Sequence, residues 1–309
     1  MHISTSVRRR TGARTSRASY NPHPVMELAY LDRTARGRLI VGGRDRRDLL
    51  HRLGTNDVLG LDAGHGRSSC FCTPKGRMID WAVLLDRGSD LLLLSGNPER
   101  LSGHIQQYTI TEDVTVRNYI AVELVICGPA ARTFLGVELE PYCHATKRLG
   151  EVEALIARIE PLLGDAYAVL APDAALLRQS LAAKGRQLSP EQERLARIRA
   201  GIPAFPEEVN EEHNPWEAGL GAAVSLTKGC YIGQEVIARL HTYDKVQKRL
   251  VGLRLEEPRE AGAPLLLEGK EVGRVTSAVG TLAMGYVTVE TAAAGTRLDG
   301  ALVAAFPLD

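Results

Sequence analysis

The feature that most constrains the fold is a pair of short apolar runs that lies between stretches with helical periodicity. Residues 78–85 and 91–94 are apolar, and the segment Asp-Arg-Gly-Ser-Asp between them is typical of a hairpin turn. Apolar residues recur at helical spacing over residues 45–53, and Asn97-Pro98-Glu99 has the composition of a second helix start. Antiparallel strand pairs between helices predict an α+β fold and argue against a doubly wound parallel sheet.

The same alternation continues along the chain. Strands are predicted over residues 38–42, 121–126 and 167–170, and helices over residues 129–135 and 172–184. Gly136 and Gly185 are plausible helix stops. The segment Ser189-Pro190-Glu191-Gln192 resembles a capping box and predicts a helix that ends near residue 200.

The character of the sequence changes near residue 248. Four short β-type runs follow at residues 250–255, 264–267, 271–277 and 281–289, separated by glycines. This pattern favours a small antiparallel β-barrel or sandwich of about 60 residues. We therefore expect an α+β region over residues 26–247 and a separate β domain over residues 248–309.

Charge and composition exclude several classes of protein. The 309-residue chain has a net charge of +1, a hydrophobic content of 44% and a charged content of 24%, which are values of a globular protein. No apolar run is long enough to cross a bilayer. Residues 1–25 carry five arginines and no acid, and the rest holds 33 basic against 37 acidic side chains, which gives no electrostatic reason to expect nucleic-acid binding.

The basic leader over residues 1–25 is predicted to be disordered. It has the Arg- and Ser-rich composition of an organelle transit peptide, but Met26 stands directly before the first sequence that looks folded. We favour Met26 as the true start, with a cytoplasmic bacterial protein as the consequence. A mitochondrial or plastid location is expected only if the leader is a genuine transit peptide.

The five cysteines are an odd number scattered over the chain, which fits reduced thiols and no disulfide framework. Cys70 and Cys72 alternate with Phe71, so both thiols are expected on one face of a strand. A shared metal is conceivable there, but the spacing is not C-x-x-C and no second pair follows. We interpret the two as small buried side chains and predict no metal site.

The densest cluster of chemically active residue types lies at residues 227–235. It combines a cation, a thiol, two glycines and a carboxylate, and its last three residues, Gly233, Gln234 and Glu235, predict a turn that leads into a helix. The amides of that helix start could face a ligand. The alternative is an ordinary glycine turn with a buried Cys230 and a solvated Lys228.

These residues resemble the signature of a known family. The octet, residues 228–235, looks like that of the YgfZ family of folate-binding proteins, which are similar to the T-protein (aminomethyltransferase) of the glycine cleavage system. Further segments resemble the family in the same order: Thr55-Asn56-Asp57-Val58, Pro74-Lys75-Gly76-Arg77, Arg197-Ile198-Arg199-Ala200-Gly201-Ile202-Pro203, Pro215-Trp216-Glu217-Ala218-Gly219-Leu220 and Gly273-Arg274-Val275-Thr276-Ser277.

The resemblance implies a ring of ferredoxin-like α+β lobes and a C-terminal β-barrel around a hole that holds tetrahydrofolate or another reduced folate. It also implies an accessory role in the assembly or repair of iron-sulfur proteins, including radical enzymes that modify tRNA. The alternative is a tetrahydrofolate-dependent aminomethyltransferase. Expected partners are the folate and iron-sulfur client enzymes, with no direct contact to nucleic acid or membrane.

The octet favours the accessory role, because the related transferase has no need of a thiol and a cation beside Cys230 could favour its thiolate. The predicted catalytic residues are Cys230, Lys228 and Asp80, where Asp80 matches the first of two adjacent aspartates in the T-protein and could hold a proton near the folate. The alternative for Asp80 is a solvent-facing residue of a hairpin. Predicted folate-binding residues are Tyr231, Gly233, Gln234, Glu235, Arg239 and Glu217.

Two departures from the family pattern bear on the site. Trp81 stands at the place of the second aspartate, and Arg199 stands where the family has a glutamate that is expected to read the pterin. Because arginine cannot accept hydrogen bonds, either another acid takes that role, with Glu217 and Glu235 as the candidates, or the affinity for folate is weakened or lost. The acidic loop over residues 207–213 is interpreted as a solvated connection rather than a metal site.

Overall fold

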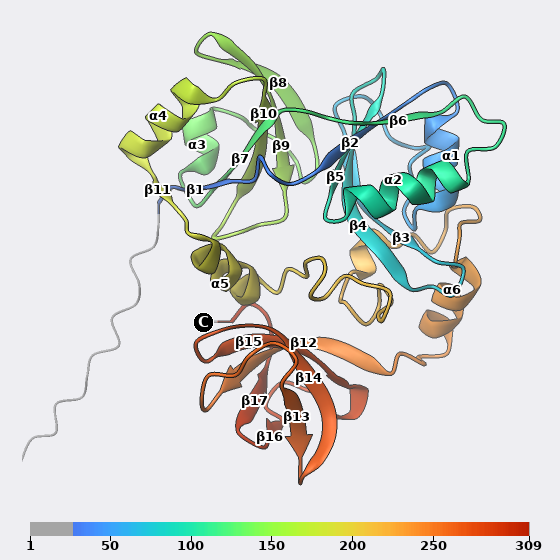
Figure 1. The fold of residues 1–309 in the computed structure, drawn as a ribbon, viewed down its shortest axis with the longest axis vertical. Helices are drawn as coiled ribbons and strands as arrows, with labels where there is room; N and C mark the ends of the chain where they lie inside the picture. The colour runs from blue at the N-terminus through green and yellow to red at the C-terminus, as the bar shows by residue number, and fades with distance from the viewer. Residues whose placement is uncertain (1–26, 309) are drawn as a thin grey trace, which may run out of the picture.

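The computed structural model describes residues 27–308 and consists of two α+β lobes and a β-barrel (Figure 1). The predictions for the leader, residues 1–25, lie outside the described residues. In Figure 1 the two α+β lobes lie side by side and the barrel lies below them, with helix α5 and the following connection between the lobes and the barrel. Within the described residues, no helix is both long enough and apolar enough to span a membrane.

The first lobe is a five-stranded antiparallel sheet with two helices on its outer face. The strand order is β3-β4-β5-β2-β6, and the elements are β2 (Arg38–Gly42), α1 (Arg46–Leu53), β3 (Gly66–Cys72), β4 (Met78–Asp86), β5 (Leu91–Ser95), α2 (Pro98–Gln107) and β6 (Thr115–Asn118). The predicted hairpin is confirmed, with Leu84 paired to Leu93. Asn97 precedes α2 as expected, but its side chain makes no capping hydrogen bond.

The second lobe is a six-stranded sheet with the order β11-β1-β7-β10-β9-β8. Its elements are β1 (Ala29–Asp32), β7 (Val122–Cys127), α3 (Ala131–Leu135), β8 (His144–Leu149), β9 (Val152–Ile159), β10 (Ala166–Ala171), α4 (Ala175–Lys184) and β11 (Arg186–Gln187). The two-residue pair of β1 with β11 is parallel and the other pairs are antiparallel. Helices α3 and α4 begin two and three residues later than the sequence pattern indicated.

The two sheets pack face to face, because their central strands are apolar on both faces. On β4, Leu84 packs toward the helices of its own lobe while Val83 and Leu85 pack against the second sheet. On β10, Val169 packs toward α3 and α4, and Ala168 packs against the first sheet. The α+β region is therefore four layers, helices-sheet-sheet-helices, which explains why these strands appear in the sequence as continuous apolar runs.

Helix α5 (Pro190–Ala200) connects the lobes to the barrel. Its predicted capping box is confirmed: the Ser189 hydroxyl accepts from the Gln192 amide at 3.2 Å, and the Gln192 side chain accepts from the Ser189 amide at 3.0 Å. Gly201 ends the helix with φ 71°, a left-handed conformation that suits glycine. The long connection that follows contains η1 (Gly221–Ala223) and α6 (Gln234–Thr242).

The interpretation of residues 207–213 as a solvated connection is wrong. Glu208 in this loop is fully buried and accepts hydrogen bonds from Arg197 at 2.6 Å and from Ser277 of the barrel at 2.6 Å. His213 is also buried and stacks on Tyr286 of the barrel with ring centroids 3.5 Å apart. The loop ties α5 to the barrel, and its burial could not be predicted from local sequence because a buried carboxylate depends on a partner far along the chain.

The C-terminal lobe is a nearly closed antiparallel barrel with the strand order β13-β14-β15-β12-β17-β16. The elements are β12 (Lys248–Leu255), β13 (Pro264–Leu267), β14 (Lys270–Val279), β15 (Leu282–Thr288), η2 (Val289–Thr291), β16 (Arg297–Leu298) and β17 (Ala301–Ala304). The amide of Asp299 donates to the carbonyl of Leu266 at 2.8 Å, which links the two ends of the sheet. The prediction of an antiparallel barrel is confirmed.

Candidate functional site

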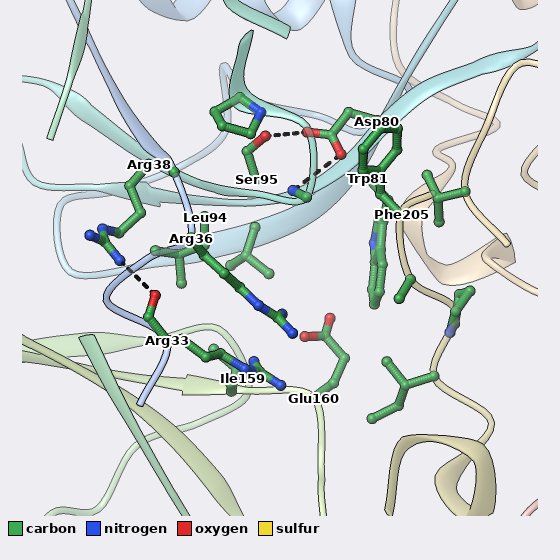
Figure 2. A pocket seen from close by; sticks show the side chains of 18 of the residues that line it. Arg33, Arg36, Arg38, Asp80, Trp81, Leu94, Ser95, Ile159, Glu160 and Phe205 are labelled. Carbon is green, nitrogen blue, oxygen red and sulfur yellow. Dashed lines mark hydrogen bonds between the residues drawn. The ribbon is translucent and has the colours of Figure 1, made fainter. Parts of the chain in front are cut away.

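A cavity of about 520 Å³ lies where the two lobes and the segment after α5 meet. This volume lies within the range of small-molecule sites. Its walls come from the segment that joins β1 to β2, from β4 and β5, from the end of β9 and from the residues after α5. The lining side chains labelled in Figure 2 are Arg33, Arg36, Arg38, Asp80, Trp81, Leu94, Ser95, Ile159, Glu160 and Phe205.

Asp80 lies on β4 at the wall of this cavity and is fully buried. Its carboxylate accepts from the Ser95 hydroxyl at 2.5 Å and from the Gly96 amide at 3.2 Å (Figure 2). Burial raises the pKa of Asp80 to about 6, and the hydrogen bonds oppose that rise. The solvent-facing alternative for Asp80 is therefore wrong, and the residue is a buried acid that can change its protonation state near neutral pH.

Trp81 follows Asp80 and also lines the cavity. Its indole Nε1 is buried and has no hydrogen-bond partner among the described residues. A buried N–H without an acceptor is costly in a native protein, so such a group often marks a place where a ligand or a water binds. Leu94, Ile159 and Phe205 provide apolar surface on the same cavity (Figure 2).

Glu160 stands directly after β9 and contributes a second acid to the cavity. The Tyr142 hydroxyl donates to its Oε1 atom at 2.8 Å. Burial raises the pKa of Glu160, while the hydrogen bond from Tyr142 opposes the rise. Glu160 is thus an oriented acid on the cavity wall.

Four arginines line the cavity, and each of them contacts a carboxylate. Arg38 forms a buried ion pair with Glu123 at 2.6 Å, and Arg197 pairs with Glu208. Arg33 and Arg36 both contact the same Glu193 oxygen at 2.8 Å, so two cations share one carboxylate. Arg33 and Arg36 together therefore carry one excess positive charge, and the half-exposed side chain of Arg36 points into the cavity (Figure 2).

The octet of residues 228–235 lies elsewhere, against the turn between β3 and β4. Gly233 has φ 81° and caps α6, so the predicted turn into a helix is confirmed. A Cβ on Gly233 would lie 2.7 Å from the Thr73 carbonyl oxygen and 3.2 Å from the Gly76 Cα. Gly76 in turn is covered by Val236 and Ile237. The two glycines permit a close backbone approach that docks α6 onto the first lobe.

Lys228 anchors this same docking. Its ammonium group donates to the backbone carbonyls of Gly54 at 2.6 Å and Asn56 at 3.0 Å and also contacts the carbonyl of His51. Burial lowers the pKa of Lys228 to about 8. Lys228 is therefore not solvated, and its three partners are carbonyl groups that follow or end α1. Cys230, two residues later, is exposed, which excludes the alternative of a buried thiol.

The other predicted folate-binding residues are not on the cavity wall. Tyr231 is buried in an apolar cluster that also holds Cys70 and Cys72, as expected of small buried thiols. Glu217 accepts from the Asn214 amide at 3.0 Å and pairs with Arg77. The remaining three lie on or at the start of α6, where Glu235 and Arg239 are exposed: Gln234, Glu235 and Arg239.

Arg199 also lies outside the set of residues that line the cavity. It belongs to the last turn of α5, and its carbonyl accepts from the Leu308 amide at 2.8 Å. Its neighbour Arg197 lines the cavity instead. Of the residues predicted as functional, Asp80 alone lines the cavity. Sequence reasoning missed Glu160 and Arg36, since each stands in a connection with no motif around it.

Comparison with known proteins agrees with this architecture. Residues 25–228 match the family described as the GCVT N-terminal domain, and residues 247–308 match the CAF17 C-terminal beta-barrel domain. The chain is 31% identical over 84% of its length to an Arabidopsis thaliana chloroplastic protein named a "putative transferase", and it spans 65% of that relative's length. It is 30% identical over 78% of its length to the aminomethyltransferase of Geobacillus kaustophilus, and it spans 72% of that protein.

The structure of the glycine cleavage system aminomethyltransferase T from Bartonella henselae superimposes with a TM-score of 0.80 over 91% of this chain and 86% of that one, at 22% identity. This likeness shows the fold: the class is that of T-protein-like α+β proteins with a C-terminal barrel. Within that class, the chain belongs to the YgfZ/CAF17 family, because both parts of that family's architecture match.

Proposed function

We propose that this protein binds a reduced folate in the central cavity and acts as an accessory factor for the assembly or repair of iron-sulfur proteins. The observation that carries the folate part is the cavity itself, with its buried acid Asp80 and the Trp81 N–H, which has no partner among residues 27–308. The family resemblance implies tetrahydrofolate, and the matches to the GCVT N-terminal domain and to an aminomethyltransferase support that ligand here.

The residues of the cavity fit a folate in three respects. The apolar side chains of Leu94, Ile159 and Phe205 can cover the faces of a planar ring system. The Trp81 N–H and the Glu160 carboxyl group offer a donor and an acceptor for polar ring atoms. Arg36 supplies a cation that suits the carboxylates of the glutamate tail. When bound, the folate would supply a carrier for one-carbon units.

The accessory role draws its support from the octet and from the barrel of the CAF17 type. Cys230 is exposed beside a rigidly docked helix, so its thiol can reach another protein. We propose that Cys230 acts as a reactive thiol toward iron-sulfur client enzymes, including radical enzymes that modify tRNA. In this account the folate site and the thiol are separate places on the molecule.

The alternative function is a tetrahydrofolate-dependent aminomethyltransferase, and Asp80 is the observation that favours it. A buried carboxyl group whose pKa is raised to about 6 can hold or release a proton near neutral pH. Formation of methylenetetrahydrofolate from an aminomethyl-lipoyl donor is the decisive assay. Product formation would establish the transferase, and its absence at saturating folate would leave the accessory role.

Calorimetric titration of the full chain with tetrahydrofolate tests the folate part of the proposal. We expect binding in the micromolar range, and we expect Arg199→Glu to leave it unchanged because residue 199 is not on the cavity wall. Absence of binding would overturn this part. For the accessory part, Cys230→Ala should fail to support iron-sulfur enzymes in cells that lack their own homologue, and full rescue would overturn the thiol role.

We also propose a location for the protein. The bacterial cytoplasm is the location that goes with Met26 as the start. If residues 1–25 act as a transit peptide, the protein belongs in an organelle, as the name of the Arabidopsis relative says of that protein. Fusion of residues 1–25 to a fluorescent protein distinguishes the two, since a transit peptide carries the reporter into isolated organelles.

A further inference from the structure

We propose that Glu160 is the residue that sets ligand specificity in the cavity, by reading the adjacent N–H groups of a planar 2-amino-4-oxo heterocycle such as a pterin. In this arrangement Trp81 donates its indole N–H to an acceptor on the same ring. The inference rests on the proposed function of the cavity as a folate site, and it names the side chains that recognise the ring.

The acids on the cavity wall differ in how far their oxygens are already occupied by partners within the protein. Asp80 is committed to the Ser95 hydroxyl and the Gly96 amide, both within its own lobe. Glu123 is committed to the buried guanidinium group of Arg38. Among the described residues, the Tyr142 hydroxyl is the only side-chain donor to Glu160. Since an ionised carboxylate offers about four acceptor sites, Glu160 retains capacity for a ligand.

Glu160 forms no ion pair with another residue in the described part of the chain. No Arg or Lys nitrogen there lies within 4.0 Å of the Glu160 carboxylate, although Arg36 lines the same cavity. Arg36 instead contacts Glu193, together with Arg33. Burial raises the pKa of Glu160, although the hydrogen bond from Tyr142 and the charge of nearby Arg33 oppose the rise, and donors from a ligand would favour its ionised form.

Tyr142 holds the Glu160 side chain in place through its hydroxyl group. Tyr142, which donates to it, has φ 63°, a left-handed conformation that is uncommon for a residue with a side chain. Strained backbone of this kind clusters at ligand sites, where the surrounding structure enforces it. The phenol orients the Glu160 carboxyl group before any ligand arrives, and such preorganisation is what a specific site requires.

The Glu160 carboxylate and the Trp81 N–H match the polar edge of a 2-amino-4-oxo ring. Two neighbouring N–H donors, as on a 2-amino-4-oxo ring, can meet both oxygens of a carboxylate, which adds geometric specificity to the charge-assisted bonds. The unpartnered Trp81 N–H then requires an acceptor, and the carbonyl or a ring nitrogen of the same heterocycle supplies one. Figure 2 shows Trp81 and Glu160 both directed into the cavity.

The experiment is calorimetric titration of four full-length proteins: the wild type, Glu160→Gln, Trp81→Phe and the control Glu153→Gln. Glu153 is an exposed residue of the same strand, β9. Each protein is titrated with tetrahydrofolate, with tetrahydropterin, with p-aminobenzoylglutamate and with guanosine, which shares the 2-amino-4-oxo edge. Thermal melting of each variant verifies folding, and Glu160→Gln should keep or raise Tm because it removes a buried ionisable group.

We expect Glu160→Gln to weaken tetrahydrofolate and tetrahydropterin about tenfold or more, the effect of losing charge-assisted hydrogen bonds. Trp81→Phe should cost a few-fold, while Glu153→Gln and the p-aminobenzoylglutamate titrations should be unaffected. Tetrahydrofolate binding that is equally tight in the folded Glu160→Gln protein would overturn the inference and leave the folate function standing. Binding of guanosine but not of tetrahydrofolate, lost in Glu160→Gln, would support Glu160 and overturn the folate function. No binding of either ring to the wild type would overturn both.

Discussion

The octet at residues 228–235 and the cavity wall formed by Asp80, Trp81 and Glu160 differ in how their polar groups are satisfied. In the octet, the Lys228 ammonium group has three carbonyl partners, and Gly233 is pressed against the Thr73 carbonyl. On the cavity wall, the Trp81 N–H has no partner among the described residues and Glu160 has a single side-chain donor. Polar groups that have their hydrogen-bond partners within the protein stabilise the fold, whereas buried polar groups without such partners mark a place where a ligand can bind.

The largest effect is expected from closing the glycine contact of the octet. Gly233→Ala places a methyl group 2.7 Å from a backbone oxygen at a residue with φ 81°, and we expect a loss of about 2–4 kcal/mol in the free energy of unfolding. Urea denaturation measures this. Gly103→Ala, in a helix with open space around it, is the control and should stabilise by about 0.5–1 kcal/mol. An unchanged free energy of unfolding in Gly233→Ala would show that the octet does not stabilise the docking of α6.

A somewhat smaller effect is expected at Lys228. Lys228→Met keeps the length of the side chain but leaves the carbonyls of His51, Gly54 and Asn56 without this donor. We expect a loss of about 1–3 kcal/mol in the free energy of unfolding, again from urea denaturation. The matched control is Lys75→Met on the exposed β3–β4 turn, within about 0.5 kcal/mol of the wild type. Equal stability of the two variants would contradict the anchoring role.

On the cavity wall, Asp80→Asn should raise the free energy of unfolding at pH 8, whereas the two variants of the octet should lower it. Because the pKa of Asp80 is raised to about 6 in the folded protein, its contribution to stability is present below pH 4 and is lost as the pH rises through 6. At pH 8 the neutral Asn should therefore stabilise the protein by about 1–3 kcal/mol, and the gain should vanish near pH 4. Urea denaturation at pH 4, 6 and 8 measures this.

Asp90 supplies the control for that series, because Arg87 and the neighbouring Ser89 lower the pKa of Asp90 against the opposing effect of burial. Asp90→Asn should destabilise the protein at pH 6 and 8, with a loss that fades as the pH falls. A pH-independent difference between wild type and Asp80→Asn would show that Asp80 does not carry a buried charge.

The smallest effect on stability is expected at Cys230. Since its side chain is exposed, Cys230→Ser should change the free energy of unfolding by less than about 0.5 kcal/mol, measured by urea denaturation. Tetrahydrofolate binding should also be unchanged, because the thiol is not on the cavity wall. Weakened folate binding in this variant would join the two regions into one site and contradict their separation.

Much of the fold could be predicted from local patterns. The hairpin of β4 and β5, the capping box at Ser189 and the turn at Gly233 depend on residues close together in the chain. The strands β8 and β9 escaped prediction, and they are mixtures of polar and apolar residues without strict alternation. Burial of Glu208 was also missed, because its partner Ser277 comes from the barrel.

The cavity could be predicted only in part. Asp80 was recognised from a family resemblance and not from its own surroundings. Glu160 and Tyr142 are 18 residues apart and meet because β8 and β9 form a hairpin that the sequence did not reveal. Arg36 reaches the same space from the connection between β1 and β2. A site built from such distant segments has no recognisable sequence motif. The octet has one, because its residues are consecutive in the chain.

The central claim is that folate binds in the cavity and not at the octet. The two tryptophans of the chain can report on this claim, because one lies in each region. Trp81 lines the cavity, while Trp216 donates to the Ile237 carbonyl of α6 at 2.9 Å, beside the octet. Tetrahydrofolate titrated into Trp216→Phe, with fluorescence corrected for ligand absorption, should quench the remaining Trp81 saturably, and Trp81→Phe should show no saturable quenching of Trp216. Saturable quenching of Trp216 with none of Trp81 would place the folate at the octet and contradict this account.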